Sequence, residues 1–169
     1  MFSRHLGHGP CPAVMQNTRD RNAQTTDTTA MAFFRKKKPR KISADAKPQN
    51  PNWVKDRSGS YFRLLDLDPE EQGLTATSGI YVIWHAGVRP AYVFIGRSKN
   101  LAGALHDLAS NKDVMAYEAR GGLFVTWSLT HSAYQDGVVA YLTEQLMPLV
   151  DNPAVKNVDP VPVLAPNRT

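Results

Sequence analysis

The chain has 169 residues and a formal net charge of +5, a length that suggests one domain with additional tail residues. Its single cysteine, Cys11, excludes a disulfide framework and a zinc site built from several cysteines, and it fits a reducing compartment such as the cytoplasm. No apolar run approaches the roughly 18 residues that a membrane-spanning helix needs, and the first residues lack the continuous apolar stretch of a secretory signal.

The positive charge is concentrated near the N-terminus. Residues 1–41 hold nine Lys and Arg against two acidic residues, a net charge of +7. Residues 42–169 hold eleven Lys and Arg against thirteen acidic residues, a net charge of −2. A nucleic-acid-binding face usually requires a basic excess on the folded domain itself. The charge of the folded part therefore weakens a nucleic-acid interpretation.

Residues 1–30 are polar and contain few large apolar side chains, so they cannot bury enough surface to offset the entropy of ordering. Met31 is a second candidate translation start. Residues 33–41 combine two phenylalanines with six basic residues, namely Arg35, Lys36, Lys37, Lys38, Arg40 and Lys41. Three interpretations stay open for this basic cluster: a solvated tail, a peripheral contact with an anionic membrane surface, and a nucleic-acid tail. In each binding case the cluster would contact an acidic partner.

Three regions are expected along the chain. Residues 1–52 are predicted to be a disordered basic arm followed by a linker, because they are polar, basic and contain Pro48 and Pro51. Residues 53–153 are predicted to form the domain. Residues 154–169 are predicted to be an extended, proline-rich tail.

The domain is predicted to begin with a short helix and a hairpin. Asp68 before Pro69 is typical of a helix start, and Gly73 of a helix end. Residues 79–84 and 91–95 are rich in β-branched and aromatic side chains, which predicts two strands. The turn between them favours antiparallel pairing.

A helix is predicted next over residues 100–110, because Leu101, Leu105 and Leu108 recur at helical spacing. After a glycine turn, residues 123–129 predict a third strand. The expected fold class is therefore α+β, a small three-stranded antiparallel sheet flanked by helices.

The last predicted element is a helix that starts near residue 132. Ser132 and Gln135 have the spacing of a capping box. The apolar positions that follow, which include Val138 and Leu142, form one helical face. Pro148 marks the end of this helix.

Residues 79–101 contain a combination of short motifs at fixed spacing: Gly79-Ile80-Tyr81, then Phe94-Ile95-Gly96, then Arg97, then Asn100-Leu101. This combination resembles the motif of the GIY-YIG endonuclease superfamily. The order strand, strand, helix, strand, helix extends the likeness to about residues 78–153. The likeness does not cover residues 1–77.

The resemblance implies phosphodiester hydrolysis with a divalent metal, Mg²⁺ or Mn²⁺, held by a glutamate of a late helix. It also implies that the first tyrosine of the motif activates or orients water, while the second tyrosine and a helix arginine position phosphate and water. Tyr81 matches the first tyrosine, and Arg97 the basic residue after the second triplet. Phe94 replaces the second tyrosine, and Ala104 occupies the expected position of the arginine.

The glutamate that the resemblance implies is also displaced. Its expected place, nine residues before Pro148, is Val139. The only acidic residue between Asp136 and Pro148 is Glu144, five residues further on, and its side chain would point about 140° away. Glu144 fits the role only if the helix is shifted. Asn152 resembles the terminal asparagine of the family.

We therefore interpret the domain as a catalytically degenerate GIY-YIG-like domain that acts as a non-enzymatic binding or scaffold module. Tyr81, Phe94, Arg97 and Ala104 form its vestigial pocket, no cofactor is expected, and a protein partner is favoured. One alternative is an atypical metal-dependent endonuclease that uses Glu144, Asp107 or Asp136. Another is a nucleic-acid-binding protein that uses the basic arm.

Each of these residues also has an ordinary structural interpretation. Tyr81 and Phe94 can pack in the sheet, and Arg97 and Glu144 can be solvated surface residues. His85 and His106 stand alone and are not expected to be ligands. The three tryptophans, Trp53, Trp84 and Trp127, are expected to pack in the core or at its edge.

Overall fold

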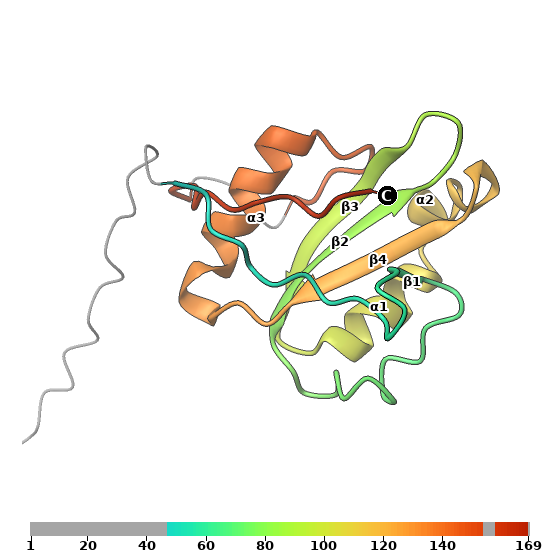
Figure 1. The fold of residues 1–169 in the computed structure, drawn as a ribbon, viewed down its shortest axis with the longest axis horizontal. Helices are drawn as coiled ribbons and strands as arrows, with labels where there is room; N and C mark the ends of the chain where they lie inside the picture. Colours follow the sequence, from blue (N-terminus) through green and yellow to red (C-terminus); the bar gives the residue numbers. More distant parts are fainter. Residues whose placement is uncertain (1–46, 154–157, 169) are drawn as a thin grey trace, which may run out of the picture. The chain divides into compact units, whose positions relative to one another are not determined.

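The β-branched and aromatic runs form a sheet in the computed structural model, which describes residues 47–153 and 158–168. These residues belong to the second of the two units into which the chain divides, Lys37–Thr169. The elements of the described part are β1 (Phe62–Arg63), β2 (Gly79–His85), β3 (Ala91–Ser98), α1 (Leu101–Ala109), α2 (Lys112–Met115), the 3₁₀ helix η1 (Glu118–Arg120), β4 (Leu123–Ser128) and α3 (Ser132–Leu146) (Figure 1).

The sheet is antiparallel, with the strand order β1-β4-β2-β3. The predicted α+β class and the predicted hairpin of β2 and β3 are confirmed. The sheet has four strands where the sequence predicts three, because the two-residue strand β1 pairs with the outer edge of β4. Within the hairpin the register shifts between Ile83 and Trp84, so Ile83 pairs with Phe94 and Trp84 with Tyr92.

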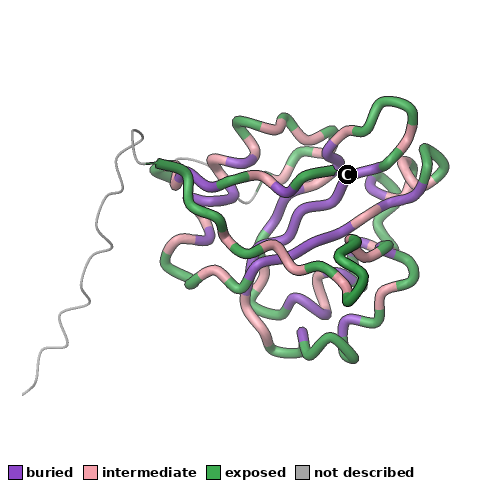
Figure 2. Tube along the Cα trace, viewed as in Figure 1, coloured by how far each residue is buried: buried purple, intermediate pink, exposed green. Residues whose placement is uncertain are grey.

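The central strand β2 is buried at all seven positions, because both faces of the sheet are covered. On one face, Tyr81 and Ile83 pack with the buried side chains of α1 and α2. On the other face, Ile80, Val82 and Trp84 pack with α3 and with the segment around Val163. Figure 2 shows the continuous burial along β2. The sheet is thus a wall between two separate apolar clusters.

The predicted helices α1 and α3 are both present. Leu101, Leu105 and Leu108 are buried along α1, as their spacing predicts. α3 buries Val138 and Leu142 and ends at Leu146, before Pro148. No helix of the described residues is long and apolar enough to cross a membrane.

The predicted capping box at the start of α3 is wrong. The N-cap residue is His131, whose ring accepts a backbone N–H. Gln135 is buried instead, and its side-chain amide donates to the Thr130 carbonyl at 2.8 Å and to the Ser78 hydroxyl at 3.0 Å. A buried amide needs such partners, so Gln135 joins the start of α3 to the residue before β2.

Residues 68–73 form a turn and not the predicted helix. The Asp68 side chain accepts the backbone N–H groups of Glu70 and Glu71 at 3.0 and 3.1 Å, as an N-cap does. Gly73 then takes a left-handed conformation with φ +69°. Start and end signals lie only one turn apart, and a single turn gains too few hydrogen bonds to propagate.

Two extended segments complete the face that carries α3. Gln49 and Val163 form an isolated parallel bridge. The Trp53 indole donates to the Leu164 carbonyl at 2.8 Å, and the Tyr92 hydroxyl donates to the Pro166 carbonyl at 2.8 Å. Segments more than 100 residues apart in the sequence therefore lie side by side over the sheet (Figure 1).

The close packing at the start of β2 leads to the first prediction. A Cβ atom at Gly79 would lie 2.6 Å from the Ser128 carbonyl oxygen and 2.9 Å from Leu101 Cδ1. Because a backbone oxygen cannot move aside, we expect Gly79→Ala to lower the free energy of unfolding by roughly 2 kcal/mol, measured by urea unfolding.

The matched control is Gly103→Ala in α1. A Cβ there would approach only the exposed Asn100 side chain, at 3.1 Å. Alanine also favours the helix by up to about 1 kcal/mol. Equal destabilisation by the two substitutions would contradict the expected clash at Gly79.

Candidate functional site

Tyr81 lies in the middle of β2 and points toward α1. Its side chain is 5% exposed, and its ring lies nearly parallel to the Phe94 ring, with centroids 6.1 Å apart. Ala104 of α1 packs against the same apolar cluster. The structure therefore brings together three of the four residues of the predicted vestigial pocket, Tyr81, Phe94 and Ala104, and their shared surroundings are apolar.

Gly96 explains how the Tyr81 ring fits across the hairpin. The two residues are cross-strand partners. A Cβ atom at Gly96 would lie 2.5 Å from the Tyr81 hydroxyl oxygen and 2.7 Å from Cζ. The phenol therefore lies flat over the glycine backbone, which only a residue without a side chain permits. In this chain Gly96, the glycine of the second motif triplet, leaves the space that the Tyr81 ring occupies.

The electrostatic surroundings of Tyr81 favour its neutral form. Burial, followed by the negative charge of Asp107 on α1, raises the pKa of the phenol to about 12. Asp107 itself is exposed. A phenol with this pKa keeps its proton near neutral pH and is a weak general base. Asp107 is the acidic residue whose charge reaches Tyr81 most strongly.

Arg97, the fourth residue of the predicted pocket, lies on the other face of the sheet. Its cross-strand partner is Ile80, which belongs to the cluster packed against α3. The Arg97 guanidinium pairs with Asp136 of α3. Both side chains are more than a third exposed, so this ion pair is a modest clamp between β3 and α3.

Glu144 is exposed on α3, and α3 packs on the face of the sheet opposite Tyr81. The sheet therefore separates this carboxylate from the phenol. Within residues 47–153 and 158–168, no three His, Cys, Asp or Glu side chains gather in one place as they would around a metal ion. Asn152 lies at the edge of the sheet, where its amide donates to the Ile95 carbonyl at 3.0 Å.

The isolated histidines occupy ordinary structural positions. His85 is buried at the end of β2, and its ring accepts the Gly87 backbone N–H at 3.4 Å. Burial, and next the charge of Arg120, lowers the pKa of His85. His106 lies on the surface beside Glu70, with Nε2 3.0 Å from a carboxylate oxygen.

Two of the three tryptophans belong to the core. Trp84 is 1% and Trp127 3% exposed, as their predicted packing role requires. The basic cluster Arg35, Lys36, Lys37, Lys38, Arg40 and Lys41 lies outside the described residues. Its predicted role as the contact for an acidic partner therefore remains a prediction.

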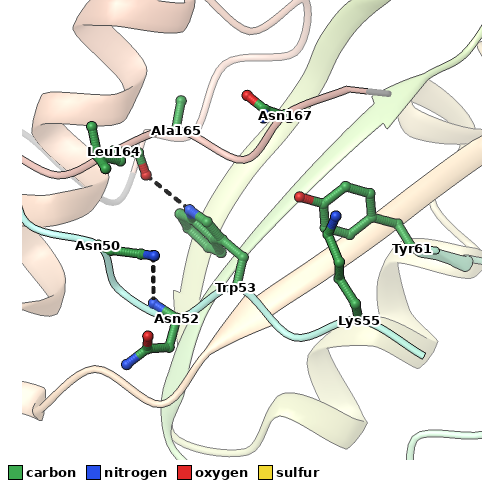
Figure 3. A pocket seen from close by; sticks show the side chains of 8 residues that line it. All are labelled: Asn50, Asn52, Trp53, Lys55, Tyr61, Leu164, Ala165 and Asn167. Atoms are coloured by element: carbon green, nitrogen blue, oxygen red, sulfur yellow. Dashed lines mark hydrogen bonds between the residues drawn. The ribbon is translucent and has the colours of Figure 1, made fainter. Parts of the chain in front are cut away.

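One site was not predicted from the sequence. Beside α3, residues 50–55 and 164–167 run on two sides of a groove of about 500 Å³, into which Tyr61 also faces (Figure 3). We call it the amide groove, after the carboxamide side chains that line it together with an ammonium and two aromatic rings: Asn50, Asn52, Asn167, Lys55, Trp53 and Tyr61. The sequence signal was the density of asparagines and aromatic residues around position 53.

Comparisons with known proteins do not assign a role to these residues: no protein-family model, no curated protein and no solved structure matches the chain. The geometry alone places the candidate residues. Tyr81, Phe94 and Ala104 lie on the α1 face of the sheet, whereas Arg97 and Glu144 lie on the α3 side.

The raised pKa of Tyr81 predicts a pH dependence. In the folded chain the proton is held to about pH 12, whereas an unfolded tyrosine releases it near its ordinary pKa of 10.0. The stability that the neutral phenol confers is complete below pH 10 and is lost as the pH rises toward 12. We expect Tyr81→Phe to flatten this fall in the free energy of unfolding, measured by urea unfolding across the same pH range.

Other groups also titrate in this range, so the informative quantity is the difference between the two proteins. Absorbance at about 295 nm should independently show that the variant loses a tyrosine that ionises late. Identical slopes for wild type and variant would show that the Tyr81 phenol is not held neutral by the fold.

Proposed function

We propose that this chain contains a GIY-YIG-like domain that has lost the nuclease reaction and acts as a non-enzymatic binding module. The observation that carries the proposal is the position of Tyr81. Its phenol lies buried over Gly96, among Phe94 and Ala104, while Arg97 and Glu144 lie on the α3 side of the sheet.

Phosphodiester hydrolysis explains why this separation matters. The reaction needs a metal-bound carboxylate near the attacking water and a cation at the phosphate, both at one place. Ala104 stands where the resemblance places the arginine, and Val139 where it places the glutamate, while Phe94 lacks the hydroxyl of the second tyrosine. Arg97 is turned to Asp136, and a neutral buried phenol cannot replace either group.

The order of the elements supports the GIY-YIG-like interpretation. β2, β3, α1, β4 and α3 follow one another as the resemblance implies, with β2 between β3 and β4. The short elements β1, α2 and η1 are additions to that order. A fold of this kind does not determine a function by itself, so the proposal depends on the residues of the site.

The absence of turnover is the direct test. We expect no nicking of supercoiled plasmid DNA above background by the full chain with Mg²⁺ or Mn²⁺. The variants Tyr81→Phe and Asp107→Asn should give the same background as wild type, because neither group would be catalytic. Glu144→Gln, on the other side of the sheet, is the matched acidic control.

Metal-dependent nicking that Tyr81→Phe abolishes would overturn the proposal in favour of an atypical nuclease. In that case the acidic variants identify the metal ligand, because loss of activity in Asp107→Asn would point to α1 and loss in Glu144→Gln to α3. Nicking that no single variant reduces would indicate a contaminating nuclease. If the Asp107→Asn, Glu144→Gln double variant, purified in the same way, gave no nicking, contamination would be excluded.

The contact for the partner is the second part of the proposal. A protein partner is favoured, and the basic arm of residues 31–41 would supply charge toward an acidic surface. Nucleic acid and an anionic membrane surface are the two other candidates for that arm. All three share the same physical signature, since screening by salt weakens each contact.

We expect deletion of residues 31–41 to remove weak binding to polyanions and to leave the thermal unfolding of the domain unchanged. Fluorescence anisotropy with labelled single-stranded DNA, and co-sedimentation with phosphatidylserine vesicles, measure the two non-protein cases at low and high salt. Binding that survives the deletion with the same salt dependence would show that the arm is not the contact.

A further inference from the structure

The amide groove presents an unusual set of groups for a surface between two extended segments. The Trp53 indole is fixed by its hydrogen bond to the Leu164 carbonyl. The Tyr61 ring meets the buried Trp84 ring edge to face, with centroids 4.8 Å apart and an interplanar angle of 88°. Figure 3 shows Trp53 toward one side of the groove and Tyr61 toward the other. Both aromatic surfaces are therefore held in place without a ligand.

Lys55 brings a positive charge to the groove that is not neutralised there. Its Nζ lies 4.5 Å from the centre of the Tyr61 ring, and no carboxylate among the described residues pairs with it. The neighbouring Asp56 is engaged elsewhere, since its side chain accepts the backbone N–H groups of Ser58 and Ser60, each at 2.8 Å. An anionic group entering the groove would meet an ammonium with no competing partner nearby.

The asparagines supply the third kind of group. The side-chain oxygen Oδ1 of Asn50 accepts the Asn52 backbone N–H at 2.9 Å, and Asn52 has a left-handed backbone with φ +58°. Asparagine adopts this conformation more readily than most residues. A carboxamide offers both a donor and an acceptor, which is the pair that a peptide group presents. The asparagines that line the groove could therefore hold the main chain of an extended segment.

We propose that the amide groove binds an extended acidic peptide segment of a protein partner. This inference rests on the proposed function as a binding module and names the chemistry of its partner. The aromatic rings contact a proline or aliphatic side chain, the carboxamides bind peptide groups, and the Lys55 ammonium binds a carboxylate. An open groove between two extended segments accommodates a chain that passes through it, which a closed cavity would not.

A saccharide is the competing ligand class, because aromatic rings and carboxamides also suit sugar rings and hydroxyl groups. The uncompensated charge of Lys55 favours the acidic peptide, since a neutral saccharide would leave the ammonium without a partner. The experiment is designed to separate the two classes.

The test uses the full chain and a displayed library of random heptapeptides, with the Asn52→Gly, Lys55→Gln double variant for counter-selection. Glycine keeps the positive φ at position 52 without strain, so this variant removes the carboxamide and should retain the fold, which its thermal unfolding checks. Lys112→Gln, on α2, is the matched control for the loss of an exposed lysine charge. We expect the library to enrich peptides that combine acidic residues with proline.

Individual enriched peptides are then measured by fluorescence anisotropy. Each single variant, Asn52→Gly and Lys55→Gln, should weaken binding roughly fivefold to tenfold, and Lys112→Gln should change it less than about twofold. Raising the salt concentration should weaken binding to wild type more than binding to Lys55→Gln.

Four results would overturn the proposal: no enrichment, enrichment without acidic residues, equal binding by the double variant, or binding to a glycan array that Asn52→Gly abolishes. The last result would assign the groove to saccharides. None of these outcomes depends on nuclease activity, so a failed peptide test leaves the non-enzymatic proposal intact. Plasmid nicking would overturn that proposal whatever the groove binds.

Discussion

The complete burial of β2 is the constraint on which the rest of the structure depends. All seven residues from Gly79 to His85 are buried, so successive side chains must contribute to two different clusters, one under α1 and one under α3. The same alternation fixes the candidate site. Tyr81 faces α1 because its neighbours Ile80 and Val82 face α3. Any residue carried by α3 therefore lies across the sheet from the phenol, whatever its position along the helix.

Two glycines, Gly79 and Gly96, let neighbouring groups approach the sheet backbone closely. At Gly79 the missing side chain admits the Ser128 carbonyl and Leu101, and at Gly96 it admits the Tyr81 phenol. The glycines that mark the motif in the sequence thus have a packing role in this chain that needs no substrate. This packing alone favours glycine at both positions, because an added Cβ at either one would meet closely packed atoms.

The sequence predicted the elements whose pattern is local, and missed what depends on contacts distant in the sequence. The hairpin, α1, β4 and α3 follow from runs of β-branched residues and from leucines at helical spacing. The two-residue strand β1 has no pattern of its own and exists only because β4 offers an edge. Asp68 makes the hydrogen bonds predicted for a helix cap, but the predicted helix does not form, because these hydrogen bonds need only a single turn.

The candidate site was predictable to the same extent. The shared surroundings of Tyr81 and Phe94 follow from their positions in a hairpin, and the absence of an arginine at Ala104 is visible in the sequence. The pairing of Arg97 with Asp136 joins residues 39 positions apart, and it depends on which face α3 covers. No local pattern shows which face of the sheet α3 covers. The candidate residues could therefore be identified from the sequence, but their positions on opposite faces could not.

The amide groove shows why binding and packing are combined on the α3 face. α3 covers only part of this side of the sheet, and two segments without regular secondary structure cover the remainder, joined by the Gln49–Val163 bridge and the Trp53–Leu164 hydrogen bond. Next to the bridge, the partly buried rings of Trp53 and Tyr61 pack against the apolar cluster that contains Trp84. Backbone that is not paired in a sheet leaves polar groups near these rings. The side chains of the asparagines and Lys55 add further polar groups there. The contacts to Leu164 and Trp84 hold the partly buried rings of Trp53 and Tyr61 in place, and the Lys55 ammonium has no carboxylate partner among the described residues. The Tyr81 phenol, by contrast, is buried beneath α1.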